Sequence, residues 1–480
     1  MSSNLFAALS ATGSALDVFQ QALSTTQNNI SNASTPGYAS QTLNLTAQPF
    51  DSASGLAGGV AAQGLISSRD QYAEETVQQQ TQTLGLYTAQ AQSTGTLQSF
   101  FDVTGTSGVS AALQNLFQSF SAWSETPSDA TARQTVLNSA SAVAGAFNSL
   151  AGSLTQQAQS MDTQISSTVS QINTIAGQIQ QYNEQVVQQT SPDPGTDAQL
   201  HAALDSLSQL VNFSTVQQSD GAVSVLLAGG SPLVMGNQAY AISSNVSVST
   251  IPPPVNAGSP PTAQILDAQG NDITSQMTSG QLGGLLDIRN TVLSSVLGDS
   301  QQEGTLNQLA QGLADTVNQI LESGTVSSDA GAAQGSALFT YGSGQPTNIA
   351  ASLALNPSIA AAQLAPVDSS GNANGNAQQL AALSDATSGA GTIGGESLIQ
   401  YYGTIAGDIG QANSTATDNQ TTQQQVVAQA TSMLNQVSGV SLNQQAVDVM
   451  QFQNAYQSMA QVLNVLSTMS QSLIMMMEGE

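Results

Sequence analysis

Residues that could carry out acid–base or nucleophilic chemistry are scarce in this chain, and the one candidate group surrounds its single histidine. His201 lies in a segment with helical patterning, and Asp205 follows one turn later. A nearby serine would complete a Ser–His–Asp arrangement, in which the imidazole takes the proton of the attacking hydroxyl. No Gly-x-Ser-x-Gly turn or other nucleophile context accompanies the pair. We therefore interpret His201 as a residue without a catalytic role.

The motifs of other common sites are also missing from the sequence. It has no His-Glu-x-x-His pair for zinc, and no cysteine for a thiolate site or a disulfide. Its carboxylates are scattered, without the Asp-x-Asp-x-Asp-Gly spacing of a calcium loop. The glycines of 391–395 lack the Gly-Lys-Ser/Thr ending of a phosphate loop. We predict that the protein is not an enzyme and has no catalytic, metal-binding or cofactor-binding residues.

Charge is the most unusual property of the composition. Charged residues make up 7% of the chain, against about 25% in typical soluble domains, and the net charge is −27. There is no lysine, and the arginines are Arg69, Arg133 and Arg289. This composition excludes binding to nucleic acid or to anionic lipid, because both require clustered basic residues. A form that is nearly uncharged in acid suits acidic surroundings, although compositional drift explains the same pattern.

Length and hydropathy favour an elongated helical protein. The 480 residues suggest about three domains of ~150 residues each. Apolar residues make up 40% of the chain but aromatic residues only 4%, so the cores should consist of aliphatic side chains along helices. No run approaches the roughly 18 apolar residues of a membrane span, and no basic region precedes an apolar stretch as in a cleaved signal peptide. We expect no membrane insertion.

The clearest packing pattern lies at the two ends of the sequence. In each end segment, mainly apolar residues recur at alternating steps of four and three, as in helices that pack lengthwise. This predicts two long helices that pair with each other or with neighbouring molecules. We call the two series the terminal seams: Leu5, Leu9, Thr12, Leu16, Phe19, Leu23, Thr26 and Ile30 at the start, and Val449, Phe452, Tyr456, Met459, Leu463, Leu466, Ser470 and Leu473 at the end.

Short motifs stand beside both seams. In Thr35-Pro36-Gly37-Tyr38, proline fixes φ at the second turn position and glycine accepts a positive φ at the third, which predicts a type II turn. With the Asn-rich stretch before this turn and the Ser-Gly-Val segment before the last helix, the chain resembles the bacterial flagellar axial proteins, a family of rod, hook and hook-associated components. We call these residues the axial motif: Asn28, Asn29, Asn32, Thr35, Pro36, Gly37, Tyr38, Ser438, Gly439, Val440, Phe452 and Tyr456.

Within this family, the resemblance is to the hook-associated protein 1 group of the hook–filament junction, and it reaches nearly the whole chain. It rests on the Ser-Gly-Val form, the length, and patches at Leu113–Leu137, Ala158–Val186 and 283–289. Two features depart from the pattern. Ser40 stands where many relatives have arginine, and the Met-rich tail at 475–480 is not the usual Leu-rich ending. Both leave room for a divergent partner surface.

The resemblance implies a structural component of the bacterial flagellum that forms the junction between hook and filament. It implies assembly with itself into a ring, contacts with the hook protein and with a second hook–filament junction protein, and an extracellular location reached through the type III export apparatus with an export chaperone. A hook or distal rod protein is the alternative within the family, disfavoured by Ser438-Gly439-Val440. A secreted adhesin is the alternative from another class, but neither a signal peptide nor β-solenoid repeats are present.

The predicted fold class is mainly α: an elongated helical bundle with paired N- and C-terminal coiled-coil helices and a small β-rich insertion. Residues 40–70 are rich in Gly, Ala and Ser and are expected to form a loop with short extended pieces. The prolines at 252–254 and 260–261 predict an irregular loop. The expected division is an N-terminal axial helix and turn (1–65), a bundle in three parts (66–212, 276–325 and 377–435), a β meander (213–275), a Gly/Ala-rich loop where longer relatives carry an outer domain (326–376), and a C-terminal axial helix (436–480).

Overall fold

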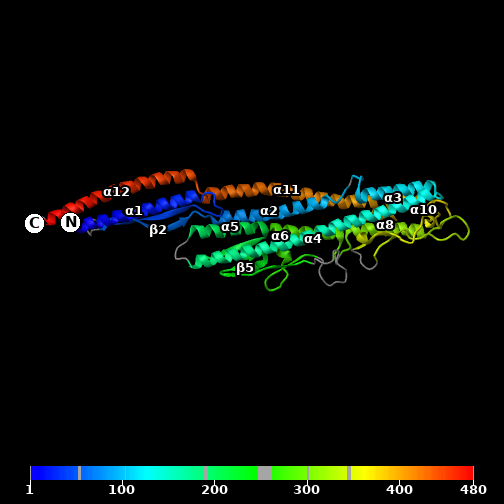
Figure 1. Ribbon diagram of the computed structural model, residues 1–480, viewed down its shortest axis with the longest axis horizontal. Coiled ribbons are helices and arrows are strands. Elements are labelled where there is room, and N and C mark those ends of the chain that lie inside the picture. The colour runs from blue at the N-terminus through cyan, green and yellow to red at the C-terminus, as the bar shows by residue number, and fades with distance from the viewer. Residues whose placement is uncertain are drawn as a thin grey trace.

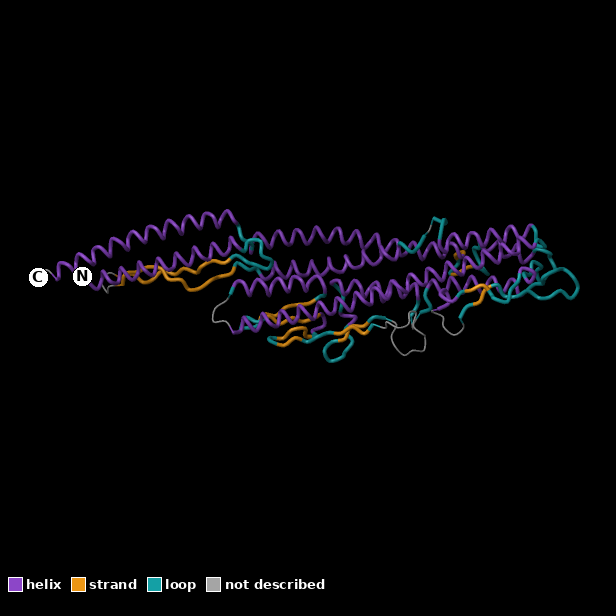
Figure 2. The backbone as a smooth tube through the Cα atoms, in the orientation of Figure 1, coloured by secondary structure: helices purple, strands orange, loops and turns teal. Residues whose placement is uncertain are grey.

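The computed structural model describes residues 2–51, 56–102, 104–188, 193–246, 262–299, 302–342 and 348–478. The molecule is elongated, and its two termini lie together at one end (Figure 1). Two parts follow each other along the long axis (Figure 2). We call the first part the rod; it consists of α1 (Ser2–Ser31), β1 (Gln41–Asp51), β2 (Leu56–Ser67) and α12 (Leu442–Glu478). The second part, the bundle, runs from α2 (Gln71–Gln98) to α11 (Leu398–Ser438).

The rod is formed by α1, which packs along both α12 and the β1–β2 hairpin. Both predicted terminal helices are therefore present, and they pair with each other. α1 ends before Pro36 because proline has no N–H to continue a helix and disfavours helical φ/ψ for the residue before it. Strands β1 and β2 pair antiparallel over their full length, from Gln41 with Ser67 to Asp51 with Leu56.

This long hairpin shows that the loop expected at 40–70 was wrong. Alternating Thr and Leu in β1 favour a strand, but the Gly-, Ala- and Ser-rich composition of β2 hides the pattern. Contact with α1 supplies the missing stabilisation. Gly59 has a φ of +126°, a conformation that favours glycine, and a Cβ at this position would be in ordinary contact with the Ala11 Cβ at 3.7 Å.

The bundle is organised around α4 (Ala130–Gln188), a helix of 59 residues. The Asp129 carboxylate caps its start, because it accepts hydrogen bonds from the Thr131 and Ala132 N–H groups. The Ala158–Val186 patch lies in the C-terminal half of α4, where Met161, Ile165 and Ile172 are fully buried. The other helices are α3 (Gly108–Glu125), α5 (Pro194–Leu210), α6 (Gly280–Asp287), the π-helical turn η3 (Ile288–Val292), α7 (Leu293–Leu297), α8 (Thr305–Glu322) and α10 (Gly375–Ala382).

The β insertion contains the predicted meander. Strands β3 (Phe213–Gln217), β4 (Val223–Leu227), β5 (Pro232–Met235) and β6 (Gln238–Ala239) form an antiparallel sheet in chain order. A separate pair, β7 (Ser243–Asn245) and β8 (Gln264–Leu266), flanks the prolines at 252–254 and 260–261, and that predicted loop lies outside the described residues. The insertion also contains 3₁₀ turns at Ala228–Gly230 and Thr274–Gln276. Much later in the chain, just before α11, lie a 3₁₀ turn at Leu383–Asp385 and a hairpin of β11 (Thr392–Ile393) and β12 (Glu396–Ser397).

Asparagine side chains attach strands and loops to the helices. Asn183 of α4 donates to the Val223 carbonyl (2.8 Å) and accepts from the Val223 N–H (2.9 Å). The carboxamide satisfies the donor and the acceptor of one backbone residue, as a neighbouring strand would. We call this arrangement an asparagine clamp. It recurs in the pairs Asn29–Gln41, Asn173–Ile242, Asn290–Ala263 and Asn318–Phe339.

The segment at 326–376 is more structured than the predicted loop. It contains β9 (Phe339–Thr340), α9 (Ile349–Ser352), β10 (Ala354–Leu355) and a 3₁₀ turn at Ala361–Gln363. Phe339 and Ile349 are buried in the same core as the bundle helices, so the described residues of this segment form a layer on the bundle. Arg133 of α4 holds the layer from outside, because its guanidinium donates to the Val326 and Ala362 carbonyls.

Candidate assembly site

The rod meets the bundle at a short neck, which we define as residues 35–40, 67–70 and 438–441. Its Thr-Pro-Gly-Tyr turn has the predicted form: the Tyr38 N–H donates to the Thr35 carbonyl (3.2 Å), and Gly37 has a φ of 73°. Gly37 also lies directly against α5, where a Cβ would be 2.7 Å from the Ala202 nitrogen. The turn therefore requires glycine both for its φ and for its contact with the bundle.

Asn29 joins three elements of the rod. Its buried carboxamide forms a clamp on Gln41 of β1 and donates to the Gln445 Oε1 of α12 (2.9 Å). The Tyr38 hydroxyl donates to the Asn29 Oδ1 (2.9 Å). Burial raises the pKa of Tyr38, so the phenol keeps the proton that it donates. Both N–H groups and both lone pairs of the carboxamide are used, which fixes the register of α1, the hairpin and α12.

The other polar residues of the first half of the axial motif stabilise the end of α1. Asn32 donates to the Asn28 Oδ1 (2.8 Å), and the Thr35 hydroxyl donates to the Asn32 Oδ1 (3.1 Å). Asn28, Thr35 and Pro36 are exposed, and Asn32 is half-buried. They form a local network on the surface of the neck.

Ser438 connects the end of α11 to the neck. Its carbonyl accepts from the Ser40 N–H (2.9 Å) and the Ser68 hydroxyl (3.0 Å), and its own hydroxyl accepts from the Asp70 N–H (2.9 Å). At Gly439, an added Cβ would collide with the Asn435 carbonyl oxygen. Val440 is half-buried. The Ser-Gly-Val segment thus sets how α11 breaks before α12 begins.

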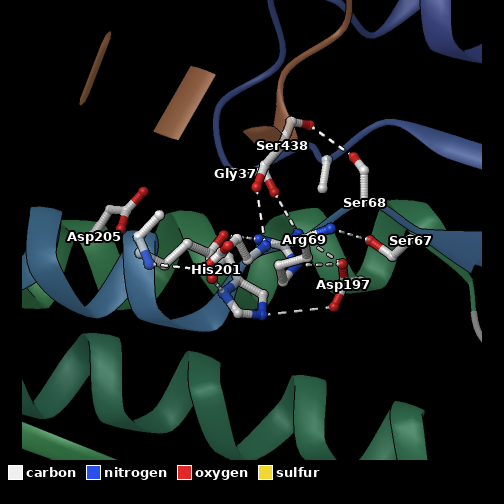
Figure 3. Close-up of polar contacts among 12 residues, drawn as sticks. Gly37, Ser67, Ser68, Arg69, Asp197, His201, Asp205 and Ser438 are labelled. Carbon is white, nitrogen blue, oxygen red and sulfur yellow. Dashed lines mark hydrogen bonds and ion pairs between the residues drawn. The ribbon is translucent and has the colours of Figure 1, made fainter. Parts of the chain in front are cut away.

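An ion-pair cluster lies beneath these contacts (Figure 3). Arg69 pairs with Glu74 of α2 and with Asp197 of α5 (2.6 Å to the latter), and it donates to the Gly37 carbonyl (2.7 Å). His201 Nδ1 lies 2.8 Å from the Glu74 Oε2, and its Nε2 lies 3.6 Å from the Asp197 Oδ1. The single histidine, in α5, therefore lies beside the neck. Its ion-pair partners are Glu74 and Asp197, not the Asp205 considered from the sequence.

The environment of the cluster shifts the pKa values of its carboxyl groups in opposite directions. Although burial opposes it, contact with His201 and Arg69 holds the pKa of Glu74 below its ordinary value of 4.5. Burial raises the pKa of Asp205, and the nearby Glu74 charge adds to this effect. Glu74 therefore remains ionised in the cluster at neutral pH and in mild acid.

The two terminal seams lie differently in the rod. In α12, the seam residues from Val449 to Leu473 are half-buried, except Tyr456, which is 37% exposed. In α1, the seam residues Thr12 and Thr26 are buried, as are the neighbouring Ala15 and Ala22. The remaining seam residues are less covered: Leu5, Leu9, Leu16, Phe19 and Leu23 are half-buried, and Ile30 is 40% exposed. The apolar surface of each predicted seam is thus only partly covered within one chain.

A further row of apolar side chains on α12 lies away from its seam. We call it the outer stripe: Val447, Met450, Val462, Val465, Met469 and Met476. These side chains are between 45% (Val462) and 69% (Met476) exposed. Toward the C-terminus, Val465, Met469 and Met476 line a shallow groove of about 470 Å³. Exposed apolar rows of this length are typical of interaction surfaces.

Within the described ranges, no group of three or more His, Asp or Glu side chains is arranged to hold a metal ion. Among the same residues, none of the helices is long and apolar enough to cross a membrane.

Comparison with known proteins identifies the family. A model of the helical domain of the flagellar hook-associated protein FlgK matches residues 94–339, just over half of the chain. The chain belongs to the FlgK family. A second model, of the flagella basal body rod protein, matches residues 9–38, which cover most of α1 and the Thr-Pro-Gly-Tyr turn. This second match coincides with the first half of the axial motif.

Individual relatives are likewise named as flagellar hook-associated proteins. The chain is 24% identical to flagellar hook-associated protein 1 of Bacillus subtilis, with 94% of each chain covered. It is 25% identical to flagellar hook-associated protein 1 of Escherichia coli over 96% of this chain and 98% of that one. Among solved structures, the flagellar hook junction protein FlgK from Burkholderia pseudomallei is 28% identical, with a TM-score of 0.48 over 55% of this chain and 46% of that one.

Family membership makes this chain a structural component of the flagellum at the hook–filament junction. Its relatives are structural flagellar proteins. The sequence drew attention to Asn29, Gly37 and Ser438, all of which lie at contacts between elements. It missed Arg69 and Gln445. Arg69 could have been singled out, because a chain with three arginines has few other ways to pair its buried carboxylates.

Proposed function

We propose that the rod is the assembly surface of a ring of identical subunits at the hook–filament junction. The observation that carries this proposal is the outer stripe of α12. A helix that already uses one apolar face on α1 has no need of a second exposed apolar row for the fold of a single chain. A second copy of the rod offers a matching surface, because Leu16, Phe19 and Leu23 of α1 are only half-buried.

Charge supports self-association through apolar contact. Residues 1–66 and 439–480 contain no lysine, arginine or histidine. Copies of the rod therefore cannot pair through opposite charges, and burial of apolar surface is the driving force that remains. In the ring, rods line up side by side around the inner tube, and the bundles form the outer layer. The hook protein on one side and a second hook–filament junction protein on the other are the axial partners.

The route to this location is also part of the proposal. Flagellar axial proteins leave through the type III export apparatus without a cleaved signal, assisted by an export chaperone. A rod that is held by partly covered helices can unfold for passage through a narrow channel at a low energetic cost. The bundle, with its continuous core, is the part that has to refold after export.

Charge substitutions on α12 test the assembly surface. Tyr456→Asp and Val465→Asp each place a carboxylate on an apolar face, where burial against a neighbour would remove its hydration without a basic partner. We expect cells with either variant to shed flagellin into the medium and to lack filaments. Gln457→Asp, on the exposed polar face of the same helix, is the matched control and should support normal filaments. Normal filaments with Val465→Asp would show that the outer stripe makes no subunit contact.

A further inference from the structure

The neck joins two parts that otherwise make few contacts. The chain crosses it twice, at 67–70 and at 438–441, and the rod elements pack mainly on each other. Apart from these two connections, the described contacts across the neck include those of Gly37 with α5, of Arg69 with its partners, and of Ser40 with Ser438. Because so few contacts cross this joint, a small number of residues determines the angle between the rod and the bundle.

Open space lies on one side of this joint. A cavity of about 530 Å³ separates the base of the hairpin from the bundle. Gln41, Leu65 and Ser67 line it from the rod, and Leu204 and Val223 line it from the bundle. Because close-packed interiors resist movement, an unfilled volume at a joint is the feature that would let one part turn against the other.

Arg69 is placed to hold the joint in one position. Its side chain is 12% exposed and contacts three parts at once: the rod turn through the Gly37 carbonyl, α2 through Glu74, and α5 through Asp197. Charge-assisted hydrogen bonds of this kind are stronger and more directional than neutral ones. His201 holds the same two carboxylates from the opposite side. The contacts to Gly37 and Asp197 exist together only when the rod lies against α5.

We propose that the neck is a two-position joint and that Arg69 is the positioning residue that keeps it closed. With the Arg69 contacts intact, the rod keeps one angle to the bundle. Without them, the rod turns about the two chain connections, and the cavity changes shape while both parts stay folded. This property belongs to the single chain, so it does not depend on ring assembly, although a ring between a bending hook and a stiffer filament could use it.

Distance measurements between spin labels test the joint. The chain has no cysteine, so introduced cysteines are labelled specifically. Ser24→Cys on α1 and Ser170→Cys on α4 are exposed and away from the neck. Double electron–electron resonance should give one narrow distance population in the otherwise unchanged full-length chain. With Arg69→Gln, we expect a broader distribution with a second population. Arg133→Gln is the matched control, because Arg133 binds carbonyls within the bundle, and it should leave the distribution narrow.

A second label pair separates movement of the joint from unfolding of the rod. Ser24→Cys on α1 and Ser458→Cys on α12 report only on the rod, and their distance should be the same with and without Arg69→Gln. Broadening of this second pair would overturn the proposal, because Arg69 would then stabilise the rod itself. An unchanged first distribution with Arg69→Gln would also overturn it, as would a broad first distribution with Arg69 present.

Discussion

The bundle and the rod use similar aliphatic side chains but bury them to different extents. In α4, Phe147, Leu154 and Met161 are fully buried at 0% exposure. In the rod, the α12 seam is half-buried, and Val465 of the outer stripe is 60% exposed. Burial of apolar surface contributes about 25 cal/mol per Å². The bundle therefore obtains its stabilisation within one chain, whereas the rod leaves part of the available stabilisation to contacts with other molecules.

The polar contacts of the bundle and the rod can be compared in the same way. In both parts, asparagine clamps attach strands or loops to helices, such as Asn183–Val223 in the bundle and Asn29–Gln41 in the rod. Ion pairs, by contrast, occur at the neck and inside the bundle, where Arg289 pairs with the buried Asp162 (2.9 Å). Neutral hydrogen bonds thus make many of the polar contacts that charged side chains also make in most soluble proteins. The difference between the two parts lies in how completely their apolar surface is covered.

The largest expected effect distinguishes the fully buried side chains of the bundle from the half-buried side chains of the rod. Phe147→Ala leaves a cavity in the bundle core and should lower the free energy of unfolding by roughly 3–5 kcal/mol. Leu463→Ala in the half-buried rod seam should lower it by no more than roughly 1 kcal/mol. Urea unfolding of the free protein followed by circular dichroism measures both. Equal losses for the two variants would show that rod and bundle are one continuous core.

A smaller effect is expected at the centre of the axial motif. Asn29→Ala removes both partners of the Gln41 backbone and the partner of the Gln445 side chain. Leaving buried groups unpaired should destabilise the rod locally by roughly 1–3 kcal/mol. Hydrogen exchange measured by mass spectrometry should become faster in β1 and in the first half of α12.

The control for this prediction is Asn32→Ala, because Asn32 is only half-buried and its side chain bonds only to the end of α1 and to the turn. It should leave the exchange of α12 unchanged. Exchange that speeds up equally with both variants would mean that the Asn29 clamp does not fix the register of the rod.

The smallest expected effect is the response of the bundle to mild acid. Burial raises the pKa of Asp162, despite its contact with Arg289, and also that of Glu303. A carboxyl whose pKa is raised by folding adds stability below its ordinary pKa and loses this contribution as the pH rises through the raised value. Glu74 and Asp193, whose pKa values are lowered, act in the opposite way and lose their contribution only as the pH falls through the lowered values, below 4.5 and 3.8 respectively.

Between pH 7 and pH 4.5, only the carboxyls with raised pKa values change their contribution, so the thermal midpoint should stay level or rise slightly as the pH falls. Below that range, the neck should be affected first, because Glu74 becomes protonated and its pairs with Arg69 and His201 are weakened. Calorimetry across this range measures the midpoint. A steep fall already above pH 4.5 would contradict the account and would also remove support for the idea that the lysine-free composition suits acidic surroundings.

The sequence predicted those features that local patterns determine. The α12 seam, the Thr-Pro-Gly-Tyr turn and the meander near 213–235 follow from periodicity and turn chemistry within a few residues. In α1, the seam residues Thr12 and Thr26 are buried, whereas the large side chains of Leu16 and Phe19 are only half-buried. The deepest positions there include Ala15 and Ala22, small residues that allow close approach of neighbouring elements.

Features that depend on distant residues could not be predicted in this way. The β1–β2 hairpin depends on contact with α1, and its glycines and alanines carry no strand signal of their own. In the neck, Arg69 meets Asp197 of α5, and the two are 128 positions apart in the chain. Pairing of this kind becomes visible only when the fold brings the two elements together.

The central claim is that the exposed apolar row of α12 becomes covered when copies of the chain assemble. Met469→Cys places a unique thiol in the outer stripe, since the chain has no other cysteine. A water-soluble maleimide should label this thiol rapidly in the free protein and at least tenfold more slowly in purified hook–filament structures, a ratio equivalent to about 1.4 kcal/mol of protection. Thr163→Cys, on an exposed face of α4, should label at similar rates in both states. Equal labelling of Met469→Cys before and after assembly would contradict the account.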